Sequence, residues 1–324
     1  MSQAFPSGYQ NLDHDTHLID IGLYRPELGA CYLLRDGDEL AFVDCGTARS
    51  LPQILATIET LGCRPEQVRW VIPTHVHLDH GGGAGQLMAA CPNATLVAHP
   101  NGYPHLVDPS RLQAGATAVY GEEEFARDYG ELLAVPAERA IAAEEGQQFE
   151  LGGRKLSFIH TPGHANHHGC VFDSQSGYLF TGDTFGLGYQ EFAASSPYIV
   201  ATTSPVAFDP EAWQDSLDRM LAYQPDAVCL THYSKHVGPA SLAPMLRESI
   251  EAHVRIALEE EENGSNGRDK RLQDAVDDLL VGGAVAHCGM DAERAREILW
   301  NDIRLNAQGL GVWLKRRAKR REQA

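Results

Sequence analysis

The residues best suited to metal binding or catalysis lie in one short run, 75–80, which holds three histidines and one aspartate. This run directly follows the apolar segment Val68–Ile72, which is typical of a buried strand. Pro73 disfavours a helix at this point, so His75 and His77 are expected to project to the same side of extended chain. Neutral imidazole and carboxylate groups are ligands that suit zinc and also iron or manganese. The candidate metal ligands of this run are His75, His77, Asp79 and His80.

Four more polar side chains stand at or soon after the ends of apolar runs that resemble strands. They are Asp44, His164, Asp183 and His232. Each alone is a weak signal, because a single histidine or aspartate at a strand end is usually a cap or part of a solvated turn. Strand ends along one sheet edge converge in space, so these residues together with the run 75–80 predict one polar site.

Taken in order, these residues resemble the five motifs of the metallo-β-lactamase superfamily, and the resemblance covers about residues 17 to 235. It is closest to the branch of glyoxalase II, lactonases and thioesterases. The resemblance implies an α/β fold, the αββα four-layer sandwich, with a metal site at one edge of two sheets. It also implies that residues 241–324 are an addition to the shared core.

The resemblance further implies a role for each matching residue. The first metal ion would be held by His75, His77 and His164. The second would be held by Asp79, His80 and His232. Asp183 would bridge the two ions, Asp79 and Asp183 would be the carboxylates of the catalytic centre, and Asp44 would orient the histidine-rich loop from behind the ligands. Cysteine is absent from this set, so we do not expect hydrolysis of β-lactams.

Other histidines and a tyrosine lie next to these positions. His168, close after His164, and Tyr233, directly after His232, are candidate substrate contacts. His167 is a third candidate, with structural hydrogen bonding as an equal alternative for the two histidines. For Tyr233 simple packing is the alternative interpretation. Cys45, beside Asp44, is interpreted as a small buried residue.

Composition limits the classes of partner. The 324 residues include 26 Lys and Arg against 44 Asp and Glu, a formal net charge of -18, which argues against nucleic acid. The basic cluster Lys315 to Arg321 is the exception, and we interpret it as a solvated helix end.

No apolar run is long enough to span a membrane, and the segment 1–20 has no signal-peptide pattern. Seven cysteines without CxxC spacing predict reduced thiols and a cytoplasmic location.

The chain is expected to divide into a catalytic domain, residues 1–240, and a helical extension, residues 241–324. Apolar residues recur at helical spacing in 51–61 and through most of the extension, with a polar break at 259–267. Two segments, 99–112 and 185–209, show no clear periodicity and are expected to be long loops. Their aromatic residues either line a pocket or, as we favour, fix each loop to the core.

The predicted function is a hydrolase with two divalent metal ions, zinc in first place and iron or manganese as alternatives. A metal-bridging hydroxide would cleave an ester-type bond (thioester, lactone or phosphoester) of a small-molecule substrate. One alternative is an iron-dependent oxidoreductase of the persulfide dioxygenase type, which would hold a single iron. Another is a metal-bearing regulatory protein, for which the helical extension would be a candidate homodimer face.

Overall fold

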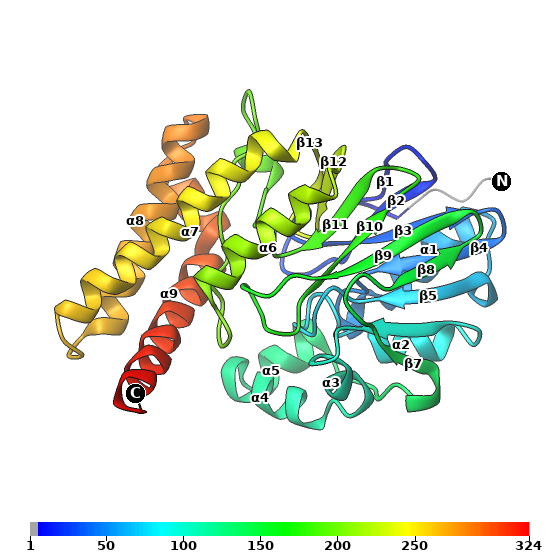
Figure 1. Cartoon of the computed structure of the whole chain (residues 1–324), viewed down its shortest axis with the longest axis horizontal. Helices are drawn as coiled ribbons and strands as arrows, with labels where there is room; N and C mark the ends of the chain where they lie inside the picture. Colours follow the sequence, from blue (N-terminus) through cyan, green and yellow to red (C-terminus); the bar gives the residue numbers. More distant parts are fainter. Residues whose placement is uncertain (1–5, 324) are drawn as a thin grey trace. The chain divides into compact units, whose positions relative to one another are not determined.

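A computed structural model describes residues 6–323, so the first five residues of the segment tested for a signal peptide lie outside it. The described chain forms two compact units, each assembled from separate segments (Figure 1). The first unit contains residues up to 160, 167–182 and 223–237. The second contains 161–166, 183–222 and 238 onward. The boundary expected at residue 240 stays a prediction.

The first unit contains a mixed sheet in the order β1-β2-β3-β4-β5-β6-β7. Its strands are β1 (Gln10–Asn11), β2 (Thr16–Asp20), β3 (Ala30–Asp36), β4 (Glu39–Val43), β5 (Val68–Ile72), β6 (Thr95–Ala98) and β7 (Ala140–Ala142). Pairing is antiparallel from β1 to β4 and parallel from β4 to β7. The parallel strands β4, β5 and β6 therefore end at the same edge of this sheet.

The same unit contains a second sheet in the order β13-β12-β11-β10-β9-β8. Its strands are β8 (Gln148–Leu151), β9 (Arg154–His160), β10 (Gly169–Asp173), β11 (Tyr178–Gly182), β12 (Ala227–Leu230) and β13 (Ser234–Val237). β11 and β12 are parallel, and β10 runs antiparallel to both β9 and β11. Consequently β9, β11 and β12 all end at one edge, where β10 begins.

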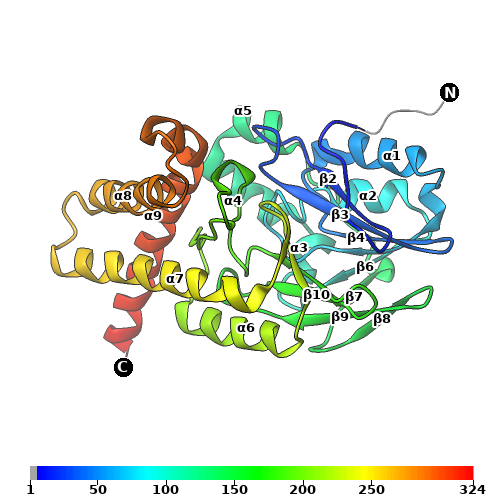
Figure 2. The same cartoon turned by 90° about the horizontal axis from the view of Figure 1, so that it is seen from above.

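The inner faces of the two sheets form one apolar core, and Figure 2 shows the sheets as separate layers. Tyr32 of β3 and Phe180 of β11 meet at a centroid distance of 5.1 Å. The Tyr32 hydroxyl also donates a hydrogen bond to the carbonyl of Leu230. Every residue of β12 is buried, as expected for a strand covered on both faces. This core fixes the strand ends that carry the polar residues.

Helices and short helical turns connect the strands of the first unit. They are η1 (Ala48–Ser50), α1 (Leu51–Thr60), η2 (Pro65–Gln67), α2 (Ala84–Ala90), α3 (Tyr103–Val107), α4 (Ser110–Tyr120), α5 (Glu122–Glu124), the π-helical turn η3 (Phe125–Tyr129) and η4 (Ala137–Arg139). α1 contacts β2, and α2 contacts β5 and β6. The expectation of a loop over 99–112 was wrong, because α3 begins there with a proline in its first turn and α4 follows.

The second unit consists of irregular segments and four long helices. After η5 (Gln190–Phe192) come α6 (Pro210–Ala222), α7 (Pro239–Glu262), α8 (Arg268–Cys288) and α9 (Ala292–Gln323). α8 packs along α9, and both contact α7 (Figure 1). The segment 185–209 is largely irregular, as expected, and Phe185 and Phe192 are buried, which supports their role in fixing it. Among the described residues, none of the helices has the length and apolar character needed to cross a membrane.

His253 of α7 gives the second unit a predicted dependence on pH. Its Nδ1 donates a hydrogen bond to the Ser249 carbonyl at 2.8 Å, and burial lowers the pKa of its imidazole to about 4. Between pH 6.5 and 4 the His253 imidazole therefore binds a proton in the unfolded chain but stays neutral in the folded chain. The folded state loses stability as the pH falls through this range. We expect wild-type protein to lose about 2 to 3 kcal/mol more unfolding free energy between pH 7 and 4.5 than His253→Leu. Urea unfolding at both pH values measures this, and equal losses would contradict the prediction.

Candidate metal centre

Asp44 organises the polar residues of the first unit. It follows β4, is fully buried and has a left-handed backbone conformation (φ 58°) that aspartate tolerates better than most residues. Its Oδ1 accepts hydrogen bonds from the Thr74 backbone N–H at 2.7 Å and the Thr74 hydroxyl at 2.8 Å. Its Oδ2 accepts from the Thr231 hydroxyl at 2.6 Å and lies 2.8 Å from His80 Nδ1. One carboxylate thus joins the ends of β4, β5 and β12.

Three of the predicted ligands come together in this unit. Asp79, His80 and His232 each offer a ligand atom, and these atoms lie within 4.8 Å of one another. His232 Nε2 is 3.2 Å from Asp79 Oδ2, and His80 Nε2 is 3.7 Å from the same oxygen. The two histidines are buried, whereas the Asp79 side chain is partly exposed. The cluster therefore combines ligands with access from solvent.

The hydrogen bonds of these histidines determine which ring nitrogen is available. His232 Nδ1 lies 2.6 Å from the Leu28 carbonyl, and a carbonyl oxygen only accepts, so Nδ1 must donate. In the neutral ring the lone pair is then on Nε2, which faces Asp79. The Asp44 carboxylate fixes the ring of His80 in the same way, because its Oδ2 accepts from His80 Nδ1.

A cation fits between these atoms. A lone pair and an ionised carboxylate repel each other unless a positive charge lies between them. Ligand atoms about 2.0–2.1 Å from a tetrahedral zinc ion lie about 3.3 Å from each other. The distance of 3.2 Å from His232 Nε2 to Asp79 Oδ2 agrees with this value. The donor set of the first unit therefore suits a divalent ion.

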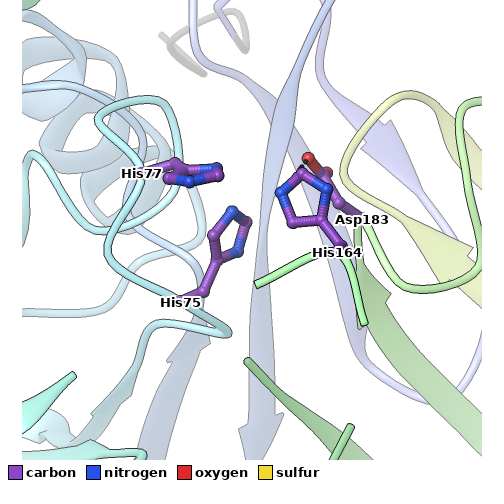
Figure 3. Close-up of side chains that lie close together, drawn as sticks. All are labelled: His75, His77, His164 and Asp183. Carbon is purple, nitrogen blue, oxygen red and sulfur yellow. Dashed lines mark ion pairs between the residues drawn. The ribbon is translucent and has the colours of Figure 1, made fainter. Parts of the chain in front are cut away.

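His75 and His77 lie next to this cluster on the loop after β5, and Figure 3 shows both rings. Their ring centroids are 4.4 Å apart, and the His75 centroid is 4.0 Å from that of His80. The rings of this run therefore lie close together, and their role as metal ligands stays a prediction. His168 stacks on His75 at 4.7 Å and is fully buried, and its role as a substrate contact stays a prediction.

His164 and Asp183 form a matching pair in the second unit. His164 Nε2 lies 3.3 Å from Asp183 Oδ2 (Figure 3), and His164 Nδ1 lies 2.8 Å from the Thr202 carbonyl. Because the Thr202 carbonyl only accepts, His164 Nδ1 donates, and in the neutral ring the lone pair on Nε2 faces the Asp183 carboxylate. Both side chains are buried. This pair has the same ligand chemistry as His232 with Asp79.

Trp213 of α6 holds the two segments that carry this pair. Its indole N–H donates to the Thr184 carbonyl, next to Asp183, at 2.6 Å, and its ring centroid lies 5.9 Å from that of His164. Gly163 has a φ of 141°, and a Cβ at this residue would lie 2.4 Å from the Trp213 Cα. Only glycine allows this close approach. Trp213 is therefore a positioning residue for His164 and Asp183.

Replacing Trp213 by phenylalanine is expected to weaken metal affinity about tenfold. Mutating residues that hold metal ligands in place typically lowers metal affinity by about this factor. The Thr184 carbonyl would lose its buried donor at a cost of about 1–3 kcal/mol. Release of metal to a competing chelator measures the effect. Trp70→Phe is the matched control, since Trp70 makes the same kind of bond to the Glu150 carbonyl at 2.7 Å. Equal metal release from both variants would contradict the positioning role.

The structure also identifies residues that the sequence analysis missed. Thr74 and Thr231 each precede a predicted ligand, and the repeated Thr-His pair after two strands was the signal available. Cys45 is buried, as expected, with its thiol directed to the His80 carbonyl at 3.0 Å. Burial raises the pKa of this thiol well above its usual value. Tyr233 is also fully buried, and its substrate contact stays a prediction.

Comparison with known proteins places these motifs in a family. A model of the metallo-β-lactamase superfamily matches residues 24–232. A metallo-β-lactamase fold-containing protein of Sulfurisphaera tokodaii is 27% identical over 240 residues, which are 71% of this chain and 84% of that protein. The acyl-coenzyme A thioesterase of Bos taurus is 27% identical over 165 residues, 47% of this chain and 56% of that protein. An atrochrysone carboxyl ACP thioesterase of Aspergillus fumigatus is 29% identical over 154 residues, 47% of this chain and 38% of that protein.

Solved structures agree on the fold. An archaeal metallo-β-lactamase superfamily protein from Sulfolobus tokodaii has a TM-score of 0.62 at 23% identity, over 92% of this chain and 99% of that one. A metallo-β-lactamase family protein from Thermus thermophilus has a TM-score of 0.58 at 18% identity, over 94% of each chain. Two sheets with helices and a C-terminal helical region confirm the expected fold class. The chain belongs to the metallo-β-lactamase superfamily.

Proposed function

We propose that this protein is a dinuclear metal-dependent hydrolase that cleaves a thioester of a small-molecule substrate. One observation carries the proposal: two histidine Nε2 atoms with fixed lone pairs face carboxylates at the spacing of metal ligands. The pairs are His232 with Asp79 at 3.2 Å and His164 with Asp183 at 3.3 Å. Membership of the superfamily and the His/Asp clusters support a divalent metal site and hydrolase chemistry.

The assignment of ligands follows the motif order. His75, His77 and His164 would hold one ion, and Asp79, His80 and His232 the other. Asp183 would reach both. All seven side chains offer imidazole nitrogen or carboxylate oxygen, which suit zinc and also iron or manganese. When bound, such ions lower the pKa of water toward neutrality and polarise a substrate carbonyl.

The chain's own residues prepare this chemistry in three ways. Asp44 and the carbonyls of Leu28 and Thr202 hold ring protons on Nδ1, so that each Nε2 keeps its lone pair. The carboxylate of Asp79 is partly exposed, and we place it where it can orient an attacking water. The carboxylate of Asp183 would supply negative charge to offset the repulsion between two bound cations.

We propose a thioester as the substrate because of the names of two relatives. The two relatives described above carry the name thioesterase, one for acyl-coenzyme A and one for atrochrysone carboxyl ACP. The chain spans less than two thirds of the length of each of these two proteins, so their substrates transfer here only as a proposal. An acidic chain also disfavours a large polyanion as substrate. Lactones and phosphoesters remain the comparison substrates.

A substrate screen with metal-loaded protein tests this function. We expect acyl thioesters to be hydrolysed with kcat/KM at least tenfold above that for lactones and phosphodiesters, with loss of activity after chelation and recovery with zinc, manganese or iron. His77→Ala should remove hydrolysis, with Val237→Ala on the exposed end of β13 as a folded control. One iron per chain with oxygen uptake would contradict the hydrolase and favour the persulfide dioxygenase. Full wild-type turnover by His77→Ala would contradict the site.

A further inference from the structure

A pocket of about 300 Å³ lies in the second unit, between the start of α6 and the last turns of α9. Its lining includes the rings of Phe208 and Trp313 and four arginines of the basic cluster noted in the sequence. The arginines are Arg316, Arg317, Arg320 and Arg321. This volume is at the lower end of the range for small-molecule sites. A basic pocket stands out in a chain whose formal net charge is -18.

The four arginines are not equally neutralised. Arg316 donates to the carbonyls of Val206 at 2.9 Å and Phe208 at 3.2 Å, which fixes its guanidinium without cancelling its charge. Arg317 and Arg321 share one carboxylate, that of Glu261, at 3.4 and 3.2 Å. For the guanidinium of Arg320, no hydrogen bond or ion pair is found within residues 6–323.

Two carboxylates also border the pocket, and they do not cancel its charge. Asp209 Oδ1 accepts a hydrogen bond from the Ala212 backbone N–H at 3.2 Å, so this side chain serves as a cap of α6. Glu211 lies in the first turn of the same helix, where the helix dipole favours a negative charge. With Glu261 included, four arginines face three acids, so the pocket keeps a surplus of one positive charge, which suits an anionic ligand.

The aromatic rings add a second requirement for the ligand. The Phe208 and Trp313 centroids are 5.9 Å apart, and the Arg317 guanidinium lies 5.6 Å from the Trp313 centroid. Aromatic rings and guanidinium planes stack on flat aromatic ligands such as bases. Arginine also binds phosphate through two parallel hydrogen bonds. The lining therefore offers both stacking surfaces and phosphate donors.

We propose that this pocket binds a nucleoside phosphate. The ligand is either a free nucleotide or the nucleotide part of a larger thioester substrate. Binding of the nucleotide goes beyond the proposed hydrolase function, and only the second source rests on that function. The pocket is also joined to a predicted metal ligand: the Asp209 N–H donates to the Gly163 carbonyl at 2.8 Å, one residue before His164.

Calorimetric titration of the full chain tests the binding without any need for activity. We expect ADP to bind at least tenfold more tightly than pyrophosphate. Arg320→Ala should weaken ADP binding at least fivefold, whereas Lys319→Ala, an exposed neighbour outside the pocket lining, should change it less than twofold. Trp313→Leu should reduce ADP affinity to that of pyrophosphate. Absence of ADP binding at millimolar concentration, equal affinity for pyrophosphate, or equal effects of the Arg320 and Lys319 variants would overturn the proposal.

Steady-state kinetics then distinguish a free nucleotide from the nucleotide part of a thioester substrate. Wild type and Arg320→Ala are compared on a coenzyme A thioester and on a truncated thioester without the nucleotide. A fivefold or larger rise in KM for the coenzyme A ester alone, with kcat retained, identifies the pocket as an anchor for substrate. Unchanged KM values for both esters, with ADP binding weakened, identify a free nucleotide as the occupant. If neither ester is hydrolysed, the proposed function fails while the titration still decides the binding.

Discussion

Asp183→Asn is expected to lower kcat for hydrolysis at least a thousandfold and to reduce the bound metal below two ions per chain. The substitution keeps the size of the side chain and removes its negative charge. Asp183 is buried, and its Oδ2 lies 3.3 Å from His164 Nε2. Removing the charge that would offset two cations leaves their repulsion uncompensated in a site with little solvent. Steady-state kinetics and metal analysis of the same preparation measure both effects.

The matched control for this variant is Asp218→Asn. Asp218 lies on α6 in the same unit, where its exposed carboxylate pairs with Arg247 at 2.6 Å. Exposed ion pairs contribute little to stability, so this variant should keep kcat and metal content within about twofold. Wild-type turnover and two bound ions in Asp183→Asn would disprove the bridging role.

Asp44→Asn is the second change with a large expected effect. An asparagine amide would place a donor where Oδ2 now accepts from the Thr231 hydroxyl and faces His80 Nδ1. To avoid two opposed donors, the proton of His80 would move to Nε2, and that nitrogen would no longer bind metal. We expect affinity for the second ion to fall about 10- to 100-fold and activity to fall with it. Asparagine also tolerates the left-handed backbone at this position, so the substitution isolates the chemistry.

Asp173→Asn separates this effect from a general loss of stability. Asp173 is fully buried and pairs with buried Arg154 at 3.4 Å, and it is not among the predicted ligands. We expect this variant to unfold more easily and to retain its metal. Competition with a chelator, combined with urea unfolding, distinguishes the two variants. Equal metal affinity in Asp44→Asn and wild type would show that the tautomer of His80 is not controlled by Asp44.

The strands that carry polar residues at their ends could be predicted from the sequence. Val68–Ile72 has the expected bounds, because it is a short apolar run ended by a proline. β2 was missed because Thr16 and Asp20 are polar residues that the fold buries through hydrogen bonds. α4 was missed because none of its residues is buried, so it has no apolar stripe to detect.

The metal ligands of the candidate site could be predicted from the sequence, but the residues that hold these ligands in place could not. His75, His80 and Asp79 stand out because chemically similar groups are close in sequence. The links from Asp44 to Thr74 and Thr231 join residues 30 and 187 positions apart, and only the packed sheets bring them together. The role of Trp213 depends on one indole hydrogen bond and on contact with Gly163. Neither leaves a local pattern in the sequence.

The central claim is that seven side chains bind two metal ions. Anomalous diffraction from a crystal grown with zinc tests it most directly, supported by metal analysis of the same protein. We predict two anomalous peaks per chain, one bound by His75, His77 and His164 and one by Asp79, His80 and His232, with Asp183 in contact with both. A single peak, or peaks away from these residues, would contradict the account.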